Sequence, residues 1–514
     1  MTEKPIRPAR TLMVQGTASS VGKSLIVTAL CRIFSGEGFK VAPFKAQNMA
    51  LNSFVTADGG EIGRAQAVQA EAAGVAPRVE MNPILLKPEG GMRSQVIVLG
   101  KSAGSMTWGE YHQRSPQLKR VIAEALRRLR AQYELVVVEG AGSPAEINLA
   151  GQDLVNMHVA AEADAPVLLV GDIDRGGVFA HLAGTMELLE PAERARVAGF
   201  IINKFRGDRA LLAPGLEFLR VRFAVPVIGV VPYVERLRIA EEDSAALEGR
   251  RSLRADDCDD IDVAVIKLPY ISNYDDFLAL EHEGGVAVRF VDAPGQLARA
   301  DIVFIPGSKS TIADLEWIRE SGLAHAIVEH NVRGGLVAGI CGGCQMLGGT
   351  IEDPHRVESD KLAADGLGLL PITTRFERAK LTAQVKARVE TASFLSGGSG
   401  EAGEIAAYEI HMGAVRRDTG AEAPFRILAR NSIAAHAADG AISRDGAVAG
   451  TMLHGIFEND VLRAAFLEGL RRRKGLVARS DARAIAAREA EYDRLAAAVA
   501  ANVDLKTLRS IVGL

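Results

Sequence analysis

Short, continuous apolar runs recur along the first half of the chain, and each is followed by a turn or by a stretch typical of a helix. These runs are residues 11–16, 134–142, 165–177, 197–207 and 225–233. Their continuity predicts strands that are buried on both faces, as in a parallel sheet covered by helices. We therefore predict that residues 1–245 form a doubly wound α/β domain.

Polar and charged residues interrupt this pattern at 241–260, which we interpret as a domain linker. Apolar runs resume at residues 261–270, 286–291, 300–308 and 334–340, with a helix-like stretch at 311–322. The renewed alternation of strand and helix predicts a second α/β domain over residues 260–460.

Towards the end of the chain the apolar runs become shorter and the composition changes. Shorter apolar runs at 367–376, 381–389 and 406–415 predict antiparallel strands, with the glycine-rich residues 397–403 as a flexible turn. Residues 461–514 are rich in alanine and arginine, and we expect a helical extension there. The basic run at 471–474 stands just before a glycine, which is typical of the C-terminal end of a helix rather than of a binding patch.

Charge and cysteine content limit the classes of partner and the cellular compartment that we expect. The chain carries 60 basic and 64 acidic residues, a formal net charge of −4, which favours small-molecule partners over nucleic acid or a membrane. It has no apolar run of about 18 residues and no secretory signal, so we expect a cytoplasmic protein. The four cysteines are too few for a disulfide framework and fit a reducing compartment.

The first strong motif is a phosphate-binding loop between the first apolar run and the first helix-like stretch. Glycines let backbone N–H groups face an anion, a lysine reaches the terminal phosphates, and a serine hydroxyl can bind Mg²⁺. Five residues, rather than the usual four, separate the two flanking glycines. The alternative is a glycine turn with an incidental lysine. The candidate nucleotide-binding residues are Gly16, Thr17, Ser20, Val21, Gly22, Lys23 and Ser24.

Three residues further along the chain extend this prediction. Glu139 ends an apolar run, where a carboxylate can complete a Mg²⁺ site with Ser24. Lys45 also follows a strand signal and could balance charge on a transferring phosphoryl group, although a solvated lysine is the alternative. Asn203, beside Lys204, stands at a strand end where a nucleotide base could be read.

The second strong motif is Gly339-Ile-Cys341-Gly342-Gly343-Cys344-Gln345, which follows an apolar strand. This spacing is typical of a nucleophile elbow, a sharp strand-to-helix turn that projects a thiol. Cys341 is the predicted nucleophile, and the backbone N–H groups of Gly342 and Gly307 are the predicted oxyanion donors. A redox pair or half of a metal site is the alternative interpretation of Cys341 and Cys344.

A thiol nucleophile needs a base, and His454 is the candidate because it follows a strand near the end of the second domain. His411 is its competitor. A usual triad has a glutamate two residues after the histidine, but Ile456 stands there. Glu458 could orient His454, and a Cys-His dyad is the simpler expectation.

Together these segments resemble the adenosylcobyric acid synthase family, the cobyric acid synthases of cobalamin biosynthesis, over nearly the whole chain. The segments that carry the resemblance are GTASSVGKS, FKAQNMALNS, NPILLKP, VVVEGAGSPAEINL, GDIDRGGVFA, INKFRGD, PGSKSTIADL, GICGGCQMLGG, YEIHMG and LHGIFEND. The front domain is similar to dethiobiotin synthetase and the back domain to class I glutamine amidotransferases of the triad type. In this branch the triad glutamate is commonly missing.

The resemblance implies ATP- and glutamine-dependent amidation of the b, d, e and g carboxyl groups of adenosylcobyrinic acid a,c-diamide. It implies ATP and Mg²⁺, with cobalt arriving in the corrinoid substrate and no transition metal bound by the protein. Polar side chains between Lys45 and Lys87 are candidates for contacting the corrinoid, although a polar helix face has an equal claim. These are Gln47, Asn48, Asn52, Glu61, Arg64 and Gln66.

Two rival functions are compatible with these motifs. Cobyrinic acid a,c-diamide synthase would share both chemistries and amidate other carboxyl groups. A P-loop partitioning or scaffold ATPase would use the first motif alone and give Cys341 no role. The sequence leaves the oligomeric state open.

Overall fold

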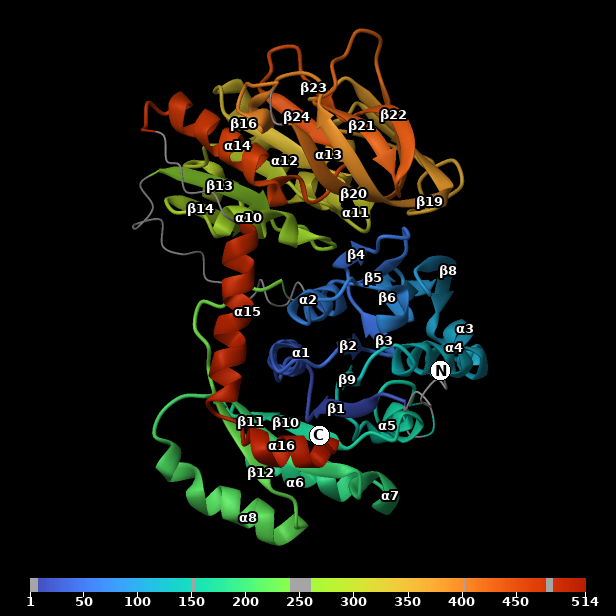
Figure 1. Ribbon diagram of the computed structural model, residues 1–514. Helices are drawn as coiled ribbons and strands as arrows, with labels where there is room; N and C mark the ends of the chain where they lie inside the picture. Colours follow the sequence, from blue (N-terminus) through green and yellow to red (C-terminus); the bar gives the residue numbers. More distant parts are fainter. Residues whose placement is uncertain (1–7, 150, 152, 241–259, 401–402, 478–483) are drawn as a thin grey trace, which may run out of the picture.

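The protein forms two bodies, one above the other in Figure 1, in a computed structural model that describes all residues except 1–7, 150, 152, 241–259, 401–402 and 478–483. Residues 8–240 make the lower body, here called the N-terminal domain, and residues 260–477 make the upper body, here called the C-terminal domain. The predicted linker lies outside the described residues except for Asp260, and so does Cys258.

A six-stranded parallel sheet forms the centre of the N-terminal domain, as the continuous apolar runs predicted. Its order is β12 (Val227–Pro232), β11 (Val197–Phe205), β10 (Val167–Asp172), β1 (Arg10–Gly16), β9 (Leu135–Glu139) and β2 (Val41–Phe44). The helices of this domain are α1 (Lys23–Gly36), α2 (Arg64–Ala72), α3 (Trp108–Gln113), α4 (Ser115–Arg130), α5 (Met157–Ala163), α6 (Val178–Leu188), α7 (Pro191–Arg194) and α8 (Ala213–Phe223). The phosphate loop and Glu139 therefore meet at the carboxyl ends of the neighbouring strands β1 and β9.

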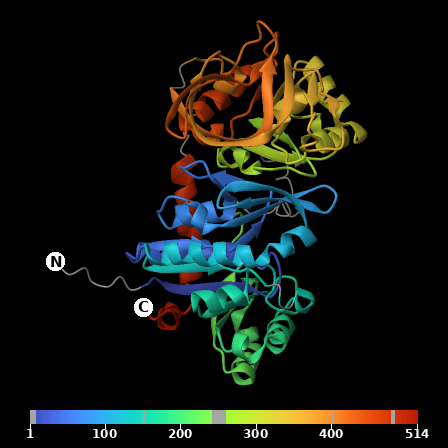
Figure 2. The ribbon, with the colours of Figure 1, turned by 90° about the vertical axis from the view of Figure 1, so that its right-hand side faces the viewer.

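An insertion between β2 and α4 faces the C-terminal domain (Figure 2). It holds a four-stranded sheet of β3 (Gln47–Met49), β6 (Ile84–Glu89), β7 (Arg93–Val98) and β8 (Lys101–Thr107), with a hairpin of β4 (Ser53–Val55) and β5 (Glu61–Gly63). The pattern of apolar runs did not predict these strands, because three of them are only three residues long and partly polar.

The C-terminal domain contains a second α/β sheet, again as predicted. Its order is β14 (Val286–Val291), β13 (Ile261–Ile266), β15 (Ile302–Ile305), β16 (Leu336–Ile340), β24 (Val448–Thr451) and β23 (Ala441–Ile442). Only β23 pairs antiparallel among these strands. Helices on it are α10 (Leu278–Glu281), α11 (Thr311–Glu320), α12 (Leu323–Val332), α13 (Gly342–Leu347) and α14 (Asp460–Arg473), which ends at the predicted basic run.

A mainly antiparallel sheet completes this domain. Its strands are β17 (Thr350–Glu352), β18 (Ala363–Asp365), β19 (Ile372–Val389), β20 (Glu404–Arg417), β21 (Phe425–Arg430) and β22 (Ile433–Asp439). The two runs predicted at 367–376 and 381–389 belong to one long strand, β19, which corrects the prediction. The register with β20 shifts between Phe376 and Leu381, so a bulge with polar residues separates two apolar stretches of the same strand. The predicted turn at 397–403 lies partly outside the described residues.

The last two helices return to the N-terminal domain. Helix α15 (Ala484–Ala500) descends along one side of the molecule, and α16 (Leu505–Val512) lies beside the first sheet (Figure 1). Buried side chains of both helices, Tyr492, Val499 and Leu508 among them, pack in one cluster with residues of α1 and β1. No helix in the described part of the chain is long and apolar enough to cross a membrane.

Candidate active sites

The loop between β1 and α1 has the shape of a phosphate cradle. Gly22 has a φ of 96°, and a Cβ there would stand 2.2 Å from the Asn203 side chain, so only glycine fits. The backbone N–H groups of residues 18–22 donate to no described residue, which leaves them free for an anion. The ammonium group of Lys23 folds over the loop and donates to the carbonyls of Ala18 and Gly142, at 2.9 and 3.0 Å.

Glu139 lies buried at the centre of this site. Its Oε1 accepts hydrogen bonds from Ser24 Oγ (2.8 Å) and Lys45 Nζ (2.9 Å), and its Oε2 accepts one from Gln69 (2.5 Å). Burial opposes the charge, but Lys45 and these hydrogen bonds prevail and keep the pKa of Glu139 below its ordinary value. The structure thus brings together an ionised carboxylate, a hydroxyl and two lysines beside the loop, which is a donor set suited to Mg²⁺ and phosphate.

Asn203 and Lys204 contact the phosphate loop itself. Asn203 Nδ2 donates to the carbonyl of Val21 (2.9 Å), and Lys204 Nζ donates to the carbonyl of Ser20 (2.7 Å) and pairs with Asp172. These two residues therefore hold the loop in place in this structure. Thr17, at the unusual position of the motif, is fixed by its N–H bond to Val170.

The six polar candidates for corrinoid contact fall into two groups. Gln47, Asn48 and Gln66 lie within the N-terminal domain, where Asn48 donates to Gln66 (3.0 Å) and Tyr111 donates to Gln47. Asn52, Glu61 and Arg64 instead make buried contacts with the C-terminal domain. The second group therefore joins the two domains.

Cys341 occupies a nucleophile elbow between β16 and α13. Its φ of 51° and ψ of −109° are strained for a residue with a side chain, and such strain is typical of the nucleophile in an elbow of this kind. Gly343 permits the turn, because a Cβ there would lie 1.9 Å from the carbonyl oxygen of Ile305. The backbone N–H of Cys341 donates to Thr451 on the neighbouring strand (2.8 Å), which fixes the elbow to the sheet.

His454 faces Cys341, but its partner is a residue that the sequence analysis missed. Asp276 Oδ2 lies 2.7 Å from His454 Nδ1, and Asp276 Oδ1 accepts the Gly455 N–H at 2.7 Å. Burial opposes a charged imidazole, yet Asp276 and, after it, Cys341 stabilise the charged form and raise the pKa of His454 to about 10. The site is a Cys-His-Asp triad, so the expectation of a dyad is corrected.

Glu458, the residue suggested as a partner for His454, binds Arg488 instead at 2.8 Å. Glu458 comes four residues after His454 and ends a short 3-10 helix (Ile456–Glu458), which directs its side chain away from the imidazole. His411, the rival base, lies on β20 with its Nε2 3.5 Å from Glu409. The stacked ring of Tyr408, at 5.1 Å between centroids, packs against His454 in its place.

The segment that carries Asp276 is held beside the triad by pairing with a neighbouring loop. Asp276 belongs to a short 3-10 helix (Tyr274–Phe277), and the strand-like segment before it pairs with the loop of Gly307 through Ile271 and Ser308. The signal in the sequence was the acidic pair Asp275-Asp276 shortly after the first strand of the domain. Sequence spacing alone gives no reason to connect it with a histidine so far along the chain.

The remaining features of the elbow agree with nucleophilic chemistry. Gly307 lies beside His454, since a Cβ there would stand 3.0 Å from His454 Cε1, and the Gly342 backbone approaches Ser308 N. Cys344 is fully buried, and burial raises the pKa of its thiol well above the ordinary value. Such a thiol is a poor redox partner for Cys341, and the two cysteines are free.

Both halves of the chain match known protein families. A family model of the CobQ/CobB/MinD/ParA nucleotide binding domain matches residues 12–247, and one of the CobB/CobQ-like glutamine amidotransferase domain matches residues 262–462. A cobyric acid synthase of Sorangium cellulosum is 61% identical over 515 residues, which cover 98% of this chain and 99% of that protein. A cobyric acid synthase of Dehalococcoides mccartyi is 50% identical over 504 residues, covering 98% of each chain.

Proposed function

The chain belongs to the cobyric acid synthase family, and from this we propose that it amidates the b, d, e and g carboxyl groups of adenosylcobyrinic acid a,c-diamide. The reaction is a glutamine-dependent amidation of the carboxyl groups of a cobyrinic acid diamide. The observation that carries the proposal is the presence, in one chain, of a phosphate loop beside an ionised Glu139 and of a Cys341–His454–Asp276 triad. A partitioning ATPase would leave the second of these sites without a purpose.

The triad supplies ammonia. The proton shared by Cys341 and His454 resides on the imidazole when the thiolate attacks the side-chain amide of glutamine, and Asp276 holds the imidazolium in place. The N–H groups of Gly342 and Gly307 receive the oxyanion, and His454 returns the proton to the departing nitrogen. Water then hydrolyses the thioester, so that one glutamine and one water yield glutamate and ammonia.

The phosphate loop makes the carboxyl group reactive. A carboxylate resists attack by ammonia, so we propose that its oxygen takes the γ-phosphoryl group of ATP and that ADP leaves. Ammonia displaces phosphate from the acyl phosphate to give the amide. Lys23 and Lys45 stabilise the transferring charge, and Ser24 and Glu139 would hold Mg²⁺, which neutralises charge on the phosphates when bound.

We further propose that ammonia crosses between the domains without entering solvent. Free ammonia is mostly protonated at neutral pH, and the ammonium ion is no nucleophile. Buried ion pairs between the domains, such as Glu61 with Lys380, support a sealed contact. The reducing cytoplasm is the compartment we propose, because Cys341 has to remain a free thiol.

Replacement of Cys341 by alanine tests the proposal. We expect Cys341→Ala to lose corrinoid amidation with glutamine and to keep amidation with added ammonium salt, as measured by mass spectrometry of the corrinoid. Cys344→Ala is the matched control, since this buried thiol takes no part in the chemistry and both nitrogen sources should support it. Full turnover of Cys341→Ala with glutamine would contradict the proposal.

A further inference from the structure

A buried ion pair crosses from the N-terminal domain to the residue beside the triad aspartate. Arg64, the first residue of α2, pairs with Asp275 Oδ2 at 3.0 Å, and both side chains are less than a tenth exposed. Asp275 and Asp276 are neighbours in the same 3-10 helix. Arg64 therefore supports the segment that positions His454, although it comes from the other domain.

A second contact holds the same segment from its other end. Asn273 donates its N–H to Asn52 Oδ1 (2.8 Å), and its side-chain oxygen accepts the Ser53 N–H (3.0 Å). Both hydrogen bonds are buried and both join the domains. The chain from Asn273 to Asp276 is thus fixed on one side by the N-terminal domain and on the other by the bonds of Asp276 to His454 and Gly455.

The charge balance gives Arg64 a specific task. Burial and the neighbouring charge of Asp276 raise the pKa of Asp275 to about 6, and Arg64 acts in the opposite direction. Two adjacent buried carboxylates repel each other, and a cation paired with one of them offsets this repulsion. Among the described residues, Asp275 Oδ1 and Arg64 Nε have no hydrogen-bond partner, and the ion pair joins Arg64 Nη2 to Asp275 Oδ2. Without the guanidinium, the short helix would have to move or take up a proton.

We propose that Arg64 is a positioning residue of the glutaminase: through Asp275 it fixes Asp276, and through Asp276 it orients His454 toward Cys341. The inference rests on the proposed function. Its consequence is that the C-terminal domain by itself does not hold its triad in the active geometry. The domain that consumes ammonia supplies a side chain that the ammonia-producing site requires.

Helix α2 connects the Arg64–Asp275 ion pair with the nucleotide site. The helix starts at Arg64, and Gln69, five residues later, donates to Glu139. Five residues of α-helix span only about 7.5 Å. A single short helix therefore contacts the triad segment at its start and the phosphate site further along, and a shift of α2 would be felt at both sites.

The test compares Arg64→Gln with the parent in the full chain, with glutamine hydrolysis and ammonium-supported amidation measured separately. We expect the kcat of glutamine hydrolysis to fall about tenfold or more, with the KM for glutamine changed less than about twofold. Ammonium-supported amidation should fall clearly less than glutamine hydrolysis does, which shows that the variant is folded. Arg64→Lys keeps the charge and should recover part of the loss.

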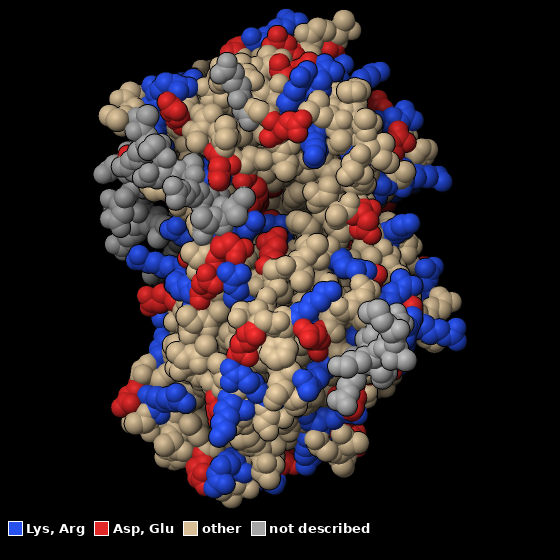
Figure 3. Space-filling model, viewed as in Figure 1, with Lys and Arg blue, Asp and Glu red and all other residues tan. Residues whose placement is uncertain are grey.

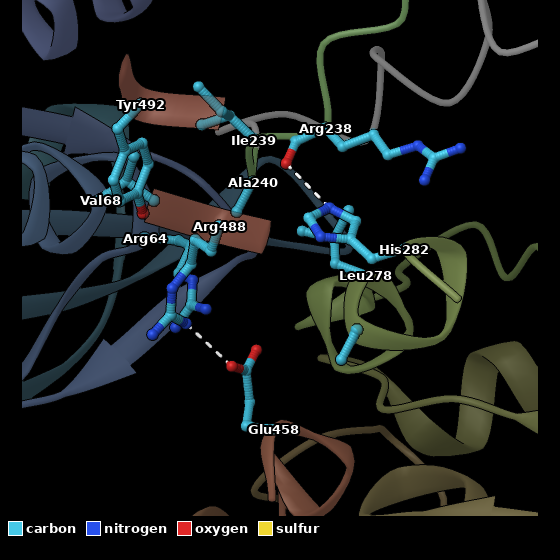
Figure 4. A pocket seen from close by; sticks show the side chains of 11 residues that line it. Arg64, Val68, Arg238, Ile239, Ala240, Leu278, His282, Glu458, Arg488 and Tyr492 are labelled. Atoms are coloured by element: carbon cyan, nitrogen blue, oxygen red, sulfur yellow. Dashed lines mark hydrogen bonds and ion pairs between the residues drawn. The ribbon is translucent and has the colours of Figure 1, made fainter. Parts of the chain in front are cut away.

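Arg488→Gln is the matched control. Arg488 lines the same small cavity between the domains (Figure 4) and pairs with Glu458 of the C-terminal domain, but it does not touch Asp275. We expect its kcat for glutamine hydrolysis to match that of the parent. An equal loss in Arg64→Gln and Arg488→Gln would overturn the inference, because domain docking in general would then explain both.

A double-mutant cycle with Asp275→Asn isolates the pair. If Arg64 acts through Asp275, the double variant should be no slower than the slower single variant. Additive losses would overturn the inference, as would a parent-like kcat in Arg64→Gln. A parent protein that forms no amide with either glutamine or ammonium would instead refute the proposed function, so the two failures are distinguishable.

Discussion

Asp276 is the single side chain that sets the orientation of the His454 imidazole. Its Oδ2 accepts a hydrogen bond from Nδ1, which leaves Nε2 to face the Cys341 thiol. The neighbouring Tyr408 ring confines the imidazole from its face. Removal of the carboxylate charge should therefore affect the ammonia-producing reaction alone.

We expect Asp276→Asn to lower the kcat of glutamine hydrolysis by about 10² to 10⁴, because the amide neither fixes the tautomer nor stabilises the imidazolium. Steady-state release of glutamate measures the effect, and ammonium-supported amidation should persist. Glu458→Gln is the control, since its carboxylate pairs with Arg488 and lies outside the triad. If the two variants behaved alike, the assignment of Asp276 to the triad would be wrong.

Local spacing was enough to select Cys341 and His454 as candidates, which the structure brings together, and it was not enough to select Asp276. Glycines surround the cysteine because backbone atoms of other segments approach this turn closely. These glycines are consecutive or nearly consecutive in the sequence, so the motif can be recognised without the fold. The aspartate is joined to His454 only by the folded chain, at a separation of 178 residues. Likewise, the polar residues Asn52, Glu61 and Arg64 carry no mark in the sequence that distinguishes a domain contact from a substrate contact.

At the scale of the elements, the buried sheets followed from the apolar runs, whereas the strands near the domain contact did not. Strands β3, β4 and β5 are too short to show a period, and they owe their form to pairing with neighbours. The C-terminal helices were predicted as an extension, and their composition could not indicate where they pack. They complete the core beside α1 and β1.

This packing predicts that α16 stabilises the opposite end of the chain. Leu508 is fully buried in the cluster with α1 and β1, so Leu508→Ala should destabilise the N-terminal domain by about 2–5 kcal/mol. The chain has two tryptophans, Trp108 in the N-terminal domain and Trp317 in the C-terminal domain. Urea unfolding of a Trp317→Phe background, followed by Trp108 fluorescence, measures the loss.

Ile511 provides the matched control on the same helix, because its side chain is only partly buried against the same cluster. Ile511→Ala should therefore reduce the free energy of unfolding clearly less than Leu508→Ala does. An unfolding midpoint unchanged by Leu508→Ala would show that α16 contributes nothing to the stability of the first sheet.

At the scale of the whole molecule, the charges on the face shown in Figure 3 are interspersed over both domains, and the stronger electrostatic feature is buried between them. Glu61 of the N-terminal domain pairs with Lys87 of its own domain at 2.9 Å and with Lys380 of β19. A more exposed pair, Glu89 with Lys309, joins the domains nearby at 2.7 Å. These contacts hold the ammonia-producing and ammonia-using halves together.

The Glu61 contact should make the association of the domains sensitive to acid. Burial alone would raise the pKa of Glu61, but the charges of Lys380 and Lys87 prevail and lower it to about 2 from an ordinary value of 4.5. Because the folded value is the lower one, the contact contributes its full stability above about pH 4.5 and loses it as the pH falls toward 2. At neutral pH, Glu61→Gln removes the carboxylate that Lys87 and Lys380 share in a buried site and should cost about 3–5 kcal/mol.

The two tryptophans allow this coupling to be measured. In the parent, a shared contact of this strength should make the urea transitions seen by Trp108 and by Trp317 move together, and both should shift to lower urea between pH 4.5 and 2. In Glu61→Gln the transitions should separate at neutral pH and lose the part of the acid shift that Glu61 causes. Glu89→Gln should have a smaller effect, because its more exposed ion pair is weakened by solvent. Transitions that stay coincident in Glu61→Gln would mean that the domains are held together by other contacts, and that the buried carboxylate serves the N-terminal domain alone.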